Sequence, residues 1–156
     1  MRILAIDYGR KRVGLAVSDP TGTLASPYQT VPNPGHRKLV PRIAAIALEL
    51  GAQRVLVGIP RLADGTLGET ARRVLAFAHA LADQLPIPVT SLDESFTTAE
   101  ARNRLADAAP KKRRSVQQER EFIDQVAAAL LLEEYLENLP PEPEPLPPLP
   151  RSGKAP

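Results

Sequence analysis

The chain has 156 residues, no cysteine and a formal net charge of +2. This length suits one compact domain with a continuous core, and the absence of cysteine excludes a disulfide scaffold and any zinc site built on cysteine. No apolar run is long enough to span a bilayer, and a strand pattern starts at the N-terminus, where a signal peptide would need an apolar segment of its own. We therefore expect a single-domain protein of the cytoplasm.

Apolar runs bounded by turn residues predict five strands, and apolar residues at helical spacing predict helices. A strand at 3–6 and its hairpin partner at 13–17 come first, with a loop at 9–12 between them. A short third strand is expected at 28–31, bracketed by prolines. The later predicted elements are, in chain order, a helix at 39–50, a strand at 54–59, a helix at 70–85, a strand at 86–92, a helix beginning at 97–98 and a helix at 118–137.

The order of these elements predicts the fold class. Hairpins at the start of the chain imply antiparallel pairs, and the later strand–helix–strand connections imply parallel pairs. We predict an α/β fold with a mixed five-stranded sheet, three antiparallel strands followed by parallel ones, flanked by helices. This domain is placed at 1–138. The proline-rich segment 139–156 cannot form a helix interior, so we expect a disordered or polyproline tail, solvated rather than bound to a proline-recognising domain.

Three acidic residues stand where an apolar or turn residue would be expected. Asp7 follows the first strand, and Glu94, with Asp93 before it, follows the strand at 86–92. Asp124 belongs to the last helix, and its neighbours three, four, seven and eleven residues on are Ala127, Ala128, Leu131 and Tyr135. Asp124 therefore lies on a core-facing stripe, where an unpaired carboxylate would be costly.

Two strand ends and a helix packed on the sheet can bring Asp7, Glu94 and Asp124 to one point. Three nearby carboxylates repel one another, and a divalent cation relieves that repulsion. Mg²⁺ and Mn²⁺ prefer hard oxygen ligands and can catalyse attack on phosphodiesters. Each acid also has a plainer explanation. Asp7 could cap a turn, and Asp93 and Glu94 could precede a helix. Asp124 could pair with an arginine such as Arg104. The joint occurrence favours the metal site.

Four sequence blocks occur in a fixed order over most of the chain. They read "ILAIDYGRKRVGLAVSD", "VLVGIPRLADGTLGETA", "LDESFTTAEA" and "EFIDQVAAALLLEEYL". With these motifs the chain resembles the YqgF/RuvX family of Holliday-junction-resolvase-like proteins, also named as pre-16S rRNA nucleases. The resemblance implies a ribonuclease-H-like fold and places the family's catalytic, metal-binding acids on Asp7, Glu94 and Asp124. The family often has arginine after the Asp-Glu pair, where this chain has Ser95; this leaves the acids intact but removes a candidate phosphate contact.

Two basic clusters are predicted to bind nucleic acid through its phosphates. They are Arg10, Lys11 and Arg12 in the first loop, and Lys111, Lys112, Arg113 and Arg114 before the last helix. Such cations would offset repulsion between an anionic substrate and an acidic site, or they could be solvated surface charges. Thr66 and Thr70 could add hydroxyl contacts or only complete a turn. Aromatic residues make up 4% of the chain, which favours recognition of backbone and shape over base stacking.

The leading hypothesis is a metal-dependent endonuclease for structured nucleic acid, with Mg²⁺ or Mn²⁺ as cofactor. By the resemblance, its substrate is the 5′ end of precursor 16S rRNA, a four-way DNA junction, or both. A junction resolvase cuts two strands symmetrically and would act as a homodimer. The alternative is a non-catalytic nucleic-acid-binding factor in transcription or ribosome assembly, and the presence of all three acids argues against it. An actin-like ATPase or sugar kinase would need a second domain, and the chain has no P-loop.

Overall fold

The computed structural model of the protein describes residues 1–94 and 115–149. In this part of the chain five strands form one sheet in the order β3-β2-β1-β4-β5. The elements are β1 (Ile3–Tyr8), β2 (Arg12–Ser18), β3 (Ala25–Pro32), α1 (His36–Glu49), β4 (Arg54–Ile59), α2 (Glu69–Gln84), β5 (Val89–Asp93) and α4 (Val116–Glu137). The pairs β1–β2 and β2–β3 are antiparallel, and β1–β4 and β4–β5 are parallel. The predicted mixed sheet is therefore confirmed.

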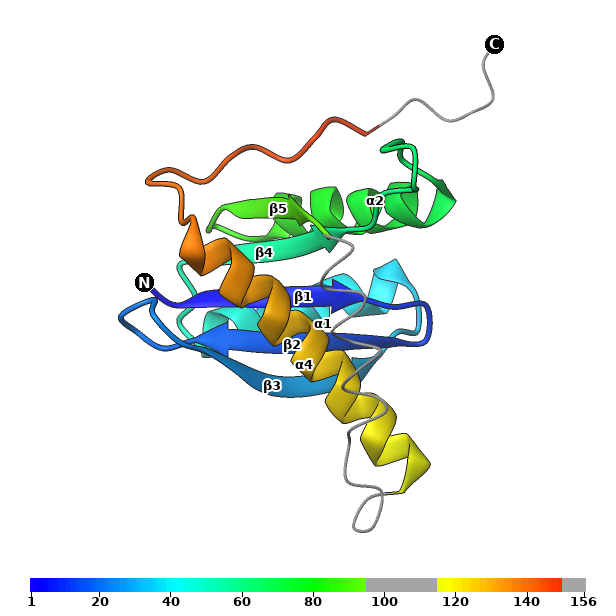
Figure 1. Cartoon of the computed structure of the whole chain (residues 1–156), viewed down its shortest axis with the longest axis horizontal. Coiled ribbons are helices and arrows are strands. Elements are labelled where there is room, and N and C mark those ends of the chain that lie inside the picture. Colours follow the sequence, from blue (N-terminus) through cyan, green and yellow to red (C-terminus); the bar gives the residue numbers. More distant parts are fainter. Residues whose placement is uncertain (95–114, 150–156) are drawn as a thin grey trace.

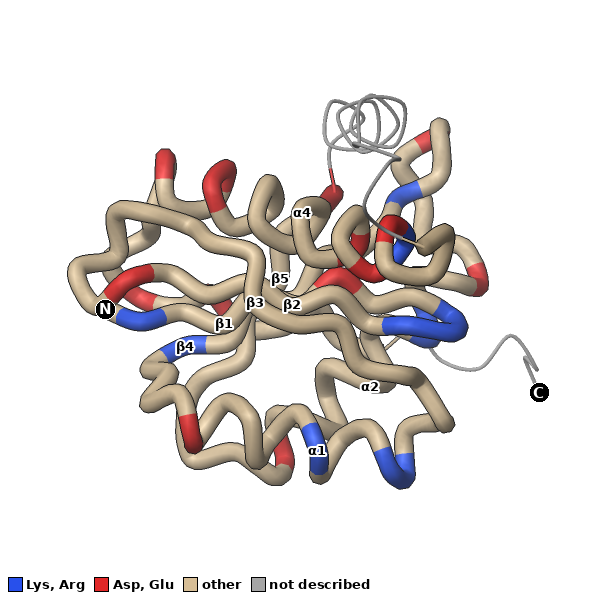
Figure 2. The backbone as a smooth tube through the Cα atoms, turned by 90° about the horizontal axis from the view of Figure 1, so that it is seen from below, with Lys and Arg blue, Asp and Glu red and all other residues tan. Residues whose placement is uncertain are grey.

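Helices cover both faces of the sheet, α1 and α2 on one and α4 on the other (Figure 1, Figure 2). Alternate residues of a strand point to opposite faces, and β1 shows the consequence. Leu4 and Ile6 belong to the apolar core under α1 and α2, whereas Ile3 and Ala5 belong to the core under α4. All four are fully buried, which explains why β1 reads as a continuous apolar run.

Four strands differ in length from the prediction, and β2 is longer than predicted by one residue at each end. β1 continues to Tyr8, so Asp7 lies inside the strand and is paired with Gly14 of β2. β3 begins at Ala25 and includes Pro27, because it is an edge strand with a register shift opposite this proline, the setting in which a strand tolerates proline. β5 begins only at Val89.

Helix α4 begins two residues earlier than predicted. Ser115 accepts a hydrogen bond from the backbone N–H of Gln118, and the Gln118 side chain accepts one from the backbone N–H of Ser115. This capping box satisfies two backbone donors at the helix start. The helix predicted from 97–98 and the basic run 111–114 lie outside the described residues.

The first part of the proline-rich tail, 139–149, contains neither helix nor strand, as its prolines predict. It packs on the domain. The carbonyl of Pro140 accepts a hydrogen bond from Arg54 (3.2 Å), and the carbonyl of Pro147 lies 2.7 Å from Nε2 of His79. Leu146 packs against the core under α1 and α2. These contacts attach 139–149 to the domain.

No helix in the described part of the chain is both long enough and apolar enough to cross a membrane.

Candidate active site

The centre of the candidate site is Asp7, on the face of the sheet that α4 covers. The alternation of β1 places Asp7 on the same face as Ile3 and Ala5. Asp7 is 7% exposed as a residue, so it is one of the few buried charged residues in the described part of the chain. Because β1 lies between β2 and β4, Asp7 has a neighbouring strand on either side. What stands beside it on those two strands decides which groups can approach its carboxylate.

On the β2 side the neighbour is Gly14, directly opposite Asp7 in the antiparallel register. A Cβ atom at Gly14 would lie 2.9 Å from the Cβ of Asp124 and closer still to the Asp124 carbonyl. Such contacts are too short for real side chains, so α4 can pack at this point only because position 14 is glycine. Gly14 therefore allows α4 to set Asp124 directly over β2, beside Asp7.

On the β4 side the neighbour is Gly58. Ile6 pairs with Val57 in the parallel register, so Asp7 is level with Gly58. A Cβ atom at Gly58 would lie 3.0 Å from Oε1 of Glu94 and 2.9 Å from a methyl carbon of Leu131. The Glu94 side chain thus occupies the space that a larger residue 58 would fill. The Glu94 backbone N–H donates to the carbonyl of Ile59 (2.9 Å), which holds the end of β5 in place.

The three predicted acids therefore lie at one end of the sheet on one face. Asp7 occupies the middle of a row whose two flanking positions are glycines, with Asp124 over one and Glu94 against the other. Within residues 1–94 and 115–149, however, no three carboxylate or imidazole side chains come close enough together to hold a metal ion. The backbone brings the three acids to the same end of one face of the sheet.

The Asp124 carboxylate is turned toward Arg12. Arg12 Nε donates to Asp124 Oδ2 at 2.7 Å, and the two side chains are 26% and 21% exposed. Arg12 belongs to β2 and shares the α4 face with Gly14, which makes this pairing possible. From the sequence, one explanation of Asp124 was an ion pair with an arginine such as Arg104, which lies outside the described residues. Arg12 was instead predicted to contact phosphates, and here its guanidinium is engaged by Asp124.

The other two cations of the first loop are free of such pairing within the described residues. Arg10 and Lys11 are exposed at the turn between β1 and β2, and Figure 2 shows the Lys and Arg positions of this loop gathered at one end of the sheet. Asn33 holds the loop from outside. Its side-chain amide donates to the Gly9 carbonyl (2.8 Å), and its backbone N–H donates to the Lys11 carbonyl (2.9 Å). A loop backbone held by these hydrogen bonds thus presents two exposed cationic side chains.

The remaining sequence candidates are placed as follows. Asp93 points away from Glu94 by strand alternation and forms a surface ion pair with Arg61 (3.1 Å), with 56% of its side chain exposed. Thr66 completes a turn, because its hydroxyl donates to the Asp64 carboxylate (2.6 Å); this bond lowers the pKa of Asp64. Thr70 lies at the start of α2 and lines a cavity described below.

The sequence interpretation gave no role to Arg73 or His36. The Tyr8 hydroxyl lies 2.8 Å from Nε2 of His36, and burial, followed by the positive charge of Arg73, lowers the pKa of His36. Arg73 and His36 are 37 positions apart, and no sequence pattern indicates that they are neighbours. Only the packing of α1, α2 and β1 brings them together.

Comparison with known proteins gives a consistent family. The model of the RuvX family, described as Holliday junction resolvase, matches residues 1–138. A protein of Thermobifida fusca with the name "Putative pre-16S rRNA nuclease" is 42% identical over 139 residues, covering 86% of each chain. A protein of the same name from Thermoanaerobacter pseudethanolicus is 36% identical over 138 residues, covering 88% of this chain and 97% of that one.

Two solved structures share the fold. RuvC of T. thermophilus in complex with a Holliday junction substrate superposes with a TM-score of 0.57 at 16% identity, covering 89% of this chain and 96% of that one. The fowlpox virus Holliday junction resolvase superposes with a TM-score of 0.53 at 15% identity, covering 89% and 100%. At these identities the likeness concerns the fold, and it confirms the predicted ribonuclease-H-like arrangement.

Proposed function

The chain belongs to the RuvX family of Holliday junction resolvases, and on that premise we propose that it is a metal-dependent endonuclease for structured nucleic acid. The first proposed substrate is the 5′ end of precursor 16S rRNA, because the relatives that are 36% and 42% identical carry that name. The second is a four-way DNA junction, which the family description and the RuvC-like fold favour. For a junction, symmetric cutting of two strands would require a homodimer. We place this activity in the cytoplasm.

One observation carries the proposal: Asp7 is buried between two glycine positions that admit Asp124 from one side and Glu94 from the other. A structural carboxylate needs one partner, and a single ion pair would meet that need. The two glycines also allow α4 to pack closely on the sheet, and together they leave room for two further acidic residues beside the same buried carboxylate. A cation shared by the three carboxylates would use this placement of the acids around Asp7, with the Asp124 carboxylate turned from Arg12 toward Asp7.

The donor set fits a divalent cation. A resolvase-like nuclease fold implies divalent-metal dependence in general, and three carboxylates supply the oxygen ligands that Mg²⁺ and Mn²⁺ prefer. We propose Mg²⁺ or Mn²⁺, held by Asp7, Glu94 and Asp124, which makes these three the catalytic residues. The ion would supply an activated water and neutralise charge on the phosphodiester.

The protein's own groups have separate tasks in this scheme. Arg10 and Lys11 would bind phosphates beside the cleaved bond, where exposed cations on a fixed loop can reach an anionic strand. Arg12 would hold the Asp124 carboxylate until a cation competes for it. Lys111, Lys112, Arg113 and Arg114 are proposed as further phosphate contacts on sequence grounds. The nuclease domain is placed at 1–138, with 139–156 as the tail.

The proposal is tested by replacing Asp7 with asparagine, a change that removes a ligand charge and keeps the size of the side chain. We expect Asp7→Asn to abolish cleavage and to retain binding, because it lowers the negative charge that faces the substrate. Cleavage is measured side by side in Mn²⁺ and Mg²⁺ on a precursor 16S rRNA 5′-leader fragment, a four-way DNA junction and a linear duplex.

Each result of this assay has a distinct meaning. Cutting confined to the leader establishes rRNA processing, and paired symmetric cuts in the junction establish a resolvase. Normal turnover by Asp7→Asn would refute the site. Binding of all substrates by the wild-type protein without any cutting would favour the non-catalytic assembly factor.

A further inference from the structure

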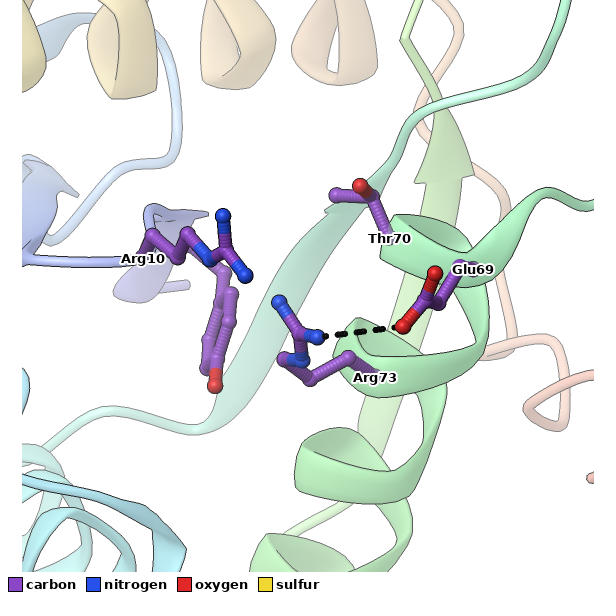
Figure 3. Close-up of a pocket in the computed structure, with 5 residues that line it drawn as sticks. Arg10, Glu69, Thr70 and Arg73 are labelled. Atoms are coloured by element: carbon purple, nitrogen blue, oxygen red, sulfur yellow. Dashed lines mark ion pairs between the residues drawn. The ribbon is translucent and has the colours of Figure 1, made fainter.

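A cavity lies at the same end of the sheet as the three acids, but on the opposite face. It has a volume of about 350 Å³ and is lined by Tyr8, Arg10, Glu69, Thr70 and Arg73 (Figure 3). Tyr8 follows Asp7 on β1, so its side chain points toward α1 and α2, where its ring packs on Phe77 with 5.1 Å between ring centroids. The cavity and the acid site are therefore the two sides of one strand end.

The cavity is dominated by two guanidinium groups. Arg10 comes from the β1–β2 loop and Arg73 from α2, and in Figure 3 they point toward one another across the space. Arg10 forms no ion pair with any described residue. Two like charges directed at one cavity repel each other, and an anion between them removes that repulsion. The Thr70 hydroxyl on the α2 side adds a hydrogen-bond donor.

Among the described residues that line the cavity, Glu69 is the one acid, and it does not neutralise Arg73 firmly. The two side chains are 3.6 Å apart, and the Glu69 side chain is 90% exposed. Exposed ion pairs of this kind have little net strength because water and salt screen them. Arg73 can therefore exchange Glu69 for a better anion. With two arginines and one glutamate, the described part of the lining carries a net positive charge.

The described residues on the Tyr8 side of the cavity add no further charge. The Tyr8 hydroxyl is bonded to His36, and both burial and the charge of Arg73 lower the pKa of that histidine. His36 is thus neutral near pH 7 and can accept a hydrogen bond from Tyr8, which fixes the phenol against the cavity wall. Among the described lining residues, the two guanidinium groups and the Thr70 hydroxyl are the groups that would select the ligand.

We propose that this cavity binds a phosphate group of the nucleic-acid strand that passes the acid site, an inference that rests on the proposed function. Guanidinium groups bind phosphate oxygens through paired N–H donors, and two of them with a hydroxyl make a site for one phosphate. Arg10 is three residues from Asp7 along the chain, at the tip of the loop that separates the two faces. A strand held at Asp7 can cross this loop at Arg10 and place its next phosphates between Arg10 and Arg73.

The experiment compares three single variants of the full chain, with metal chelated so that binding is measured without cleavage. Arg73→Gln removes a cavity charge. Arg72→Gln is the matched control, since Arg72 is exposed on the same helix and does not line the cavity. Glu69→Gln removes the opposing charge. Fluorescence anisotropy with labelled leader RNA and four-way junction gives the binding constant between 50 and 200 mM salt.

We expect Arg73→Gln to weaken binding. The plot of the logarithm of the binding constant against the logarithm of the salt concentration should become less steep by about 0.9. Between 50 and 200 mM salt the variant should therefore lose about 3.5-fold less affinity than the wild-type protein. Arg72→Gln should leave the slope unchanged, and Glu69→Gln should tighten binding. Equal effects of Arg73→Gln and Arg72→Gln, or no gain from Glu69→Gln, would overturn the proposal. Either result would leave the proposed function standing if the wild-type protein still cuts its substrate in Mn²⁺.

A titration with inorganic phosphate distinguishes a phosphate group of a nucleic-acid strand from that of a small phosphorylated compound. It is titrated into each variant, and the melting temperature is followed. Phosphate that stabilises the Arg72→Gln protein but not the Arg73→Gln protein, with no difference in salt slope between them, would assign the cavity to a small phosphorylated compound and overturn the strand assignment. A difference in slope supports the strand assignment. If the wild-type protein binds no nucleic acid at all, the proposed function fails first, and the cavity's role on a strand fails with it.

Discussion

Replacement of Gly14 by alanine tests the packing that sets Asp124 beside Asp7. The new Cβ would lie 2.9 Å from the Cβ of Asp124, whereas ordinary contacts begin near 3.4 Å, so α4 must move by at least the difference of 0.5 Å. The backbone carbonyl of Asp124 lies closer to the new Cβ and requires a larger movement of α4. Overpacking of this kind costs about 1–3 kcal/mol of folding free energy. A catalytic group displaced by about 1 Å can lose roughly a hundredfold in rate, so we expect Gly14→Ala to cleave about tenfold to a hundredfold more slowly.

The assay measures two quantities on the same protein preparation. Urea unfolding gives the loss of stability, and cleavage of the leader RNA in Mn²⁺ gives the loss of rate. Gly68→Ala is the control, because its Cβ would meet only the flexible side chain of Leu62, at 3.1–3.2 Å. A Gly14→Ala protein with wild-type stability and wild-type turnover would refute the conclusion that glycine at position 14 positions α4 and its acid.

Three further predictions concern single side chains. Arg12→Gln should tighten Mn²⁺ binding by about 1.4-fold to 5-fold, since a partly exposed ion pair worth about 0.2–1 kcal/mol no longer competes for Asp124; Lys11→Gln is the control, and unchanged affinity measured by titration calorimetry would contradict the competition. His36 has a pKa below its ordinary value of 6.5. Its contribution to stability is therefore present above about pH 6.5 and is lost as the pH falls through the pKa of the folded state. His36→Gln should remove this part of the pH dependence of urea unfolding, and an unchanged pH profile of the variant would contradict the prediction. Ser115→Ala should cost about 1 kcal/mol in the same measurement, because it removes the cap of α4, and a loss below a few tenths would show that the cap is dispensable.

The pattern-based part of the site was predictable because it depends on local geometry. The end of the first apolar run locates Asp7 near one end of the sheet, and helical spacing places Asp124 on the stripe whose other members, Ala127, Ala128, Leu131 and Tyr135, are all buried. The lengths of β1 and β3 were less predictable, because a strand ends where its partner ends. β3 accepts Pro27 only because its other edge is open.

The remaining features depend on contacts between distant parts of the chain. Arg12 and Asp124 are separated by 112 positions, and the pattern offered several arginines as partners. The function of Gly14 and Gly58 requires the register of three strands, since only that register places both beside Asp7. The sequence pattern gives Arg73 no role, because its place beside Arg10 depends on how α2 packs against the β1–β2 loop.

The contacts of the tail bear on how the open side of the sheet is protected. β5 is the last strand of the sheet, and Pro140 and Glu144 line a cavity together with Thr90 and Ser91 of that strand. The tail then continues along α2 (Figure 1), where Leu146 joins the core. An uncovered edge strand can pair with a second chain and start aggregation. Trimming the protein at residue 138, where the family match ends, would expose this edge and an apolar strip beside α2, so solubility rather than chemistry would be the first property to suffer.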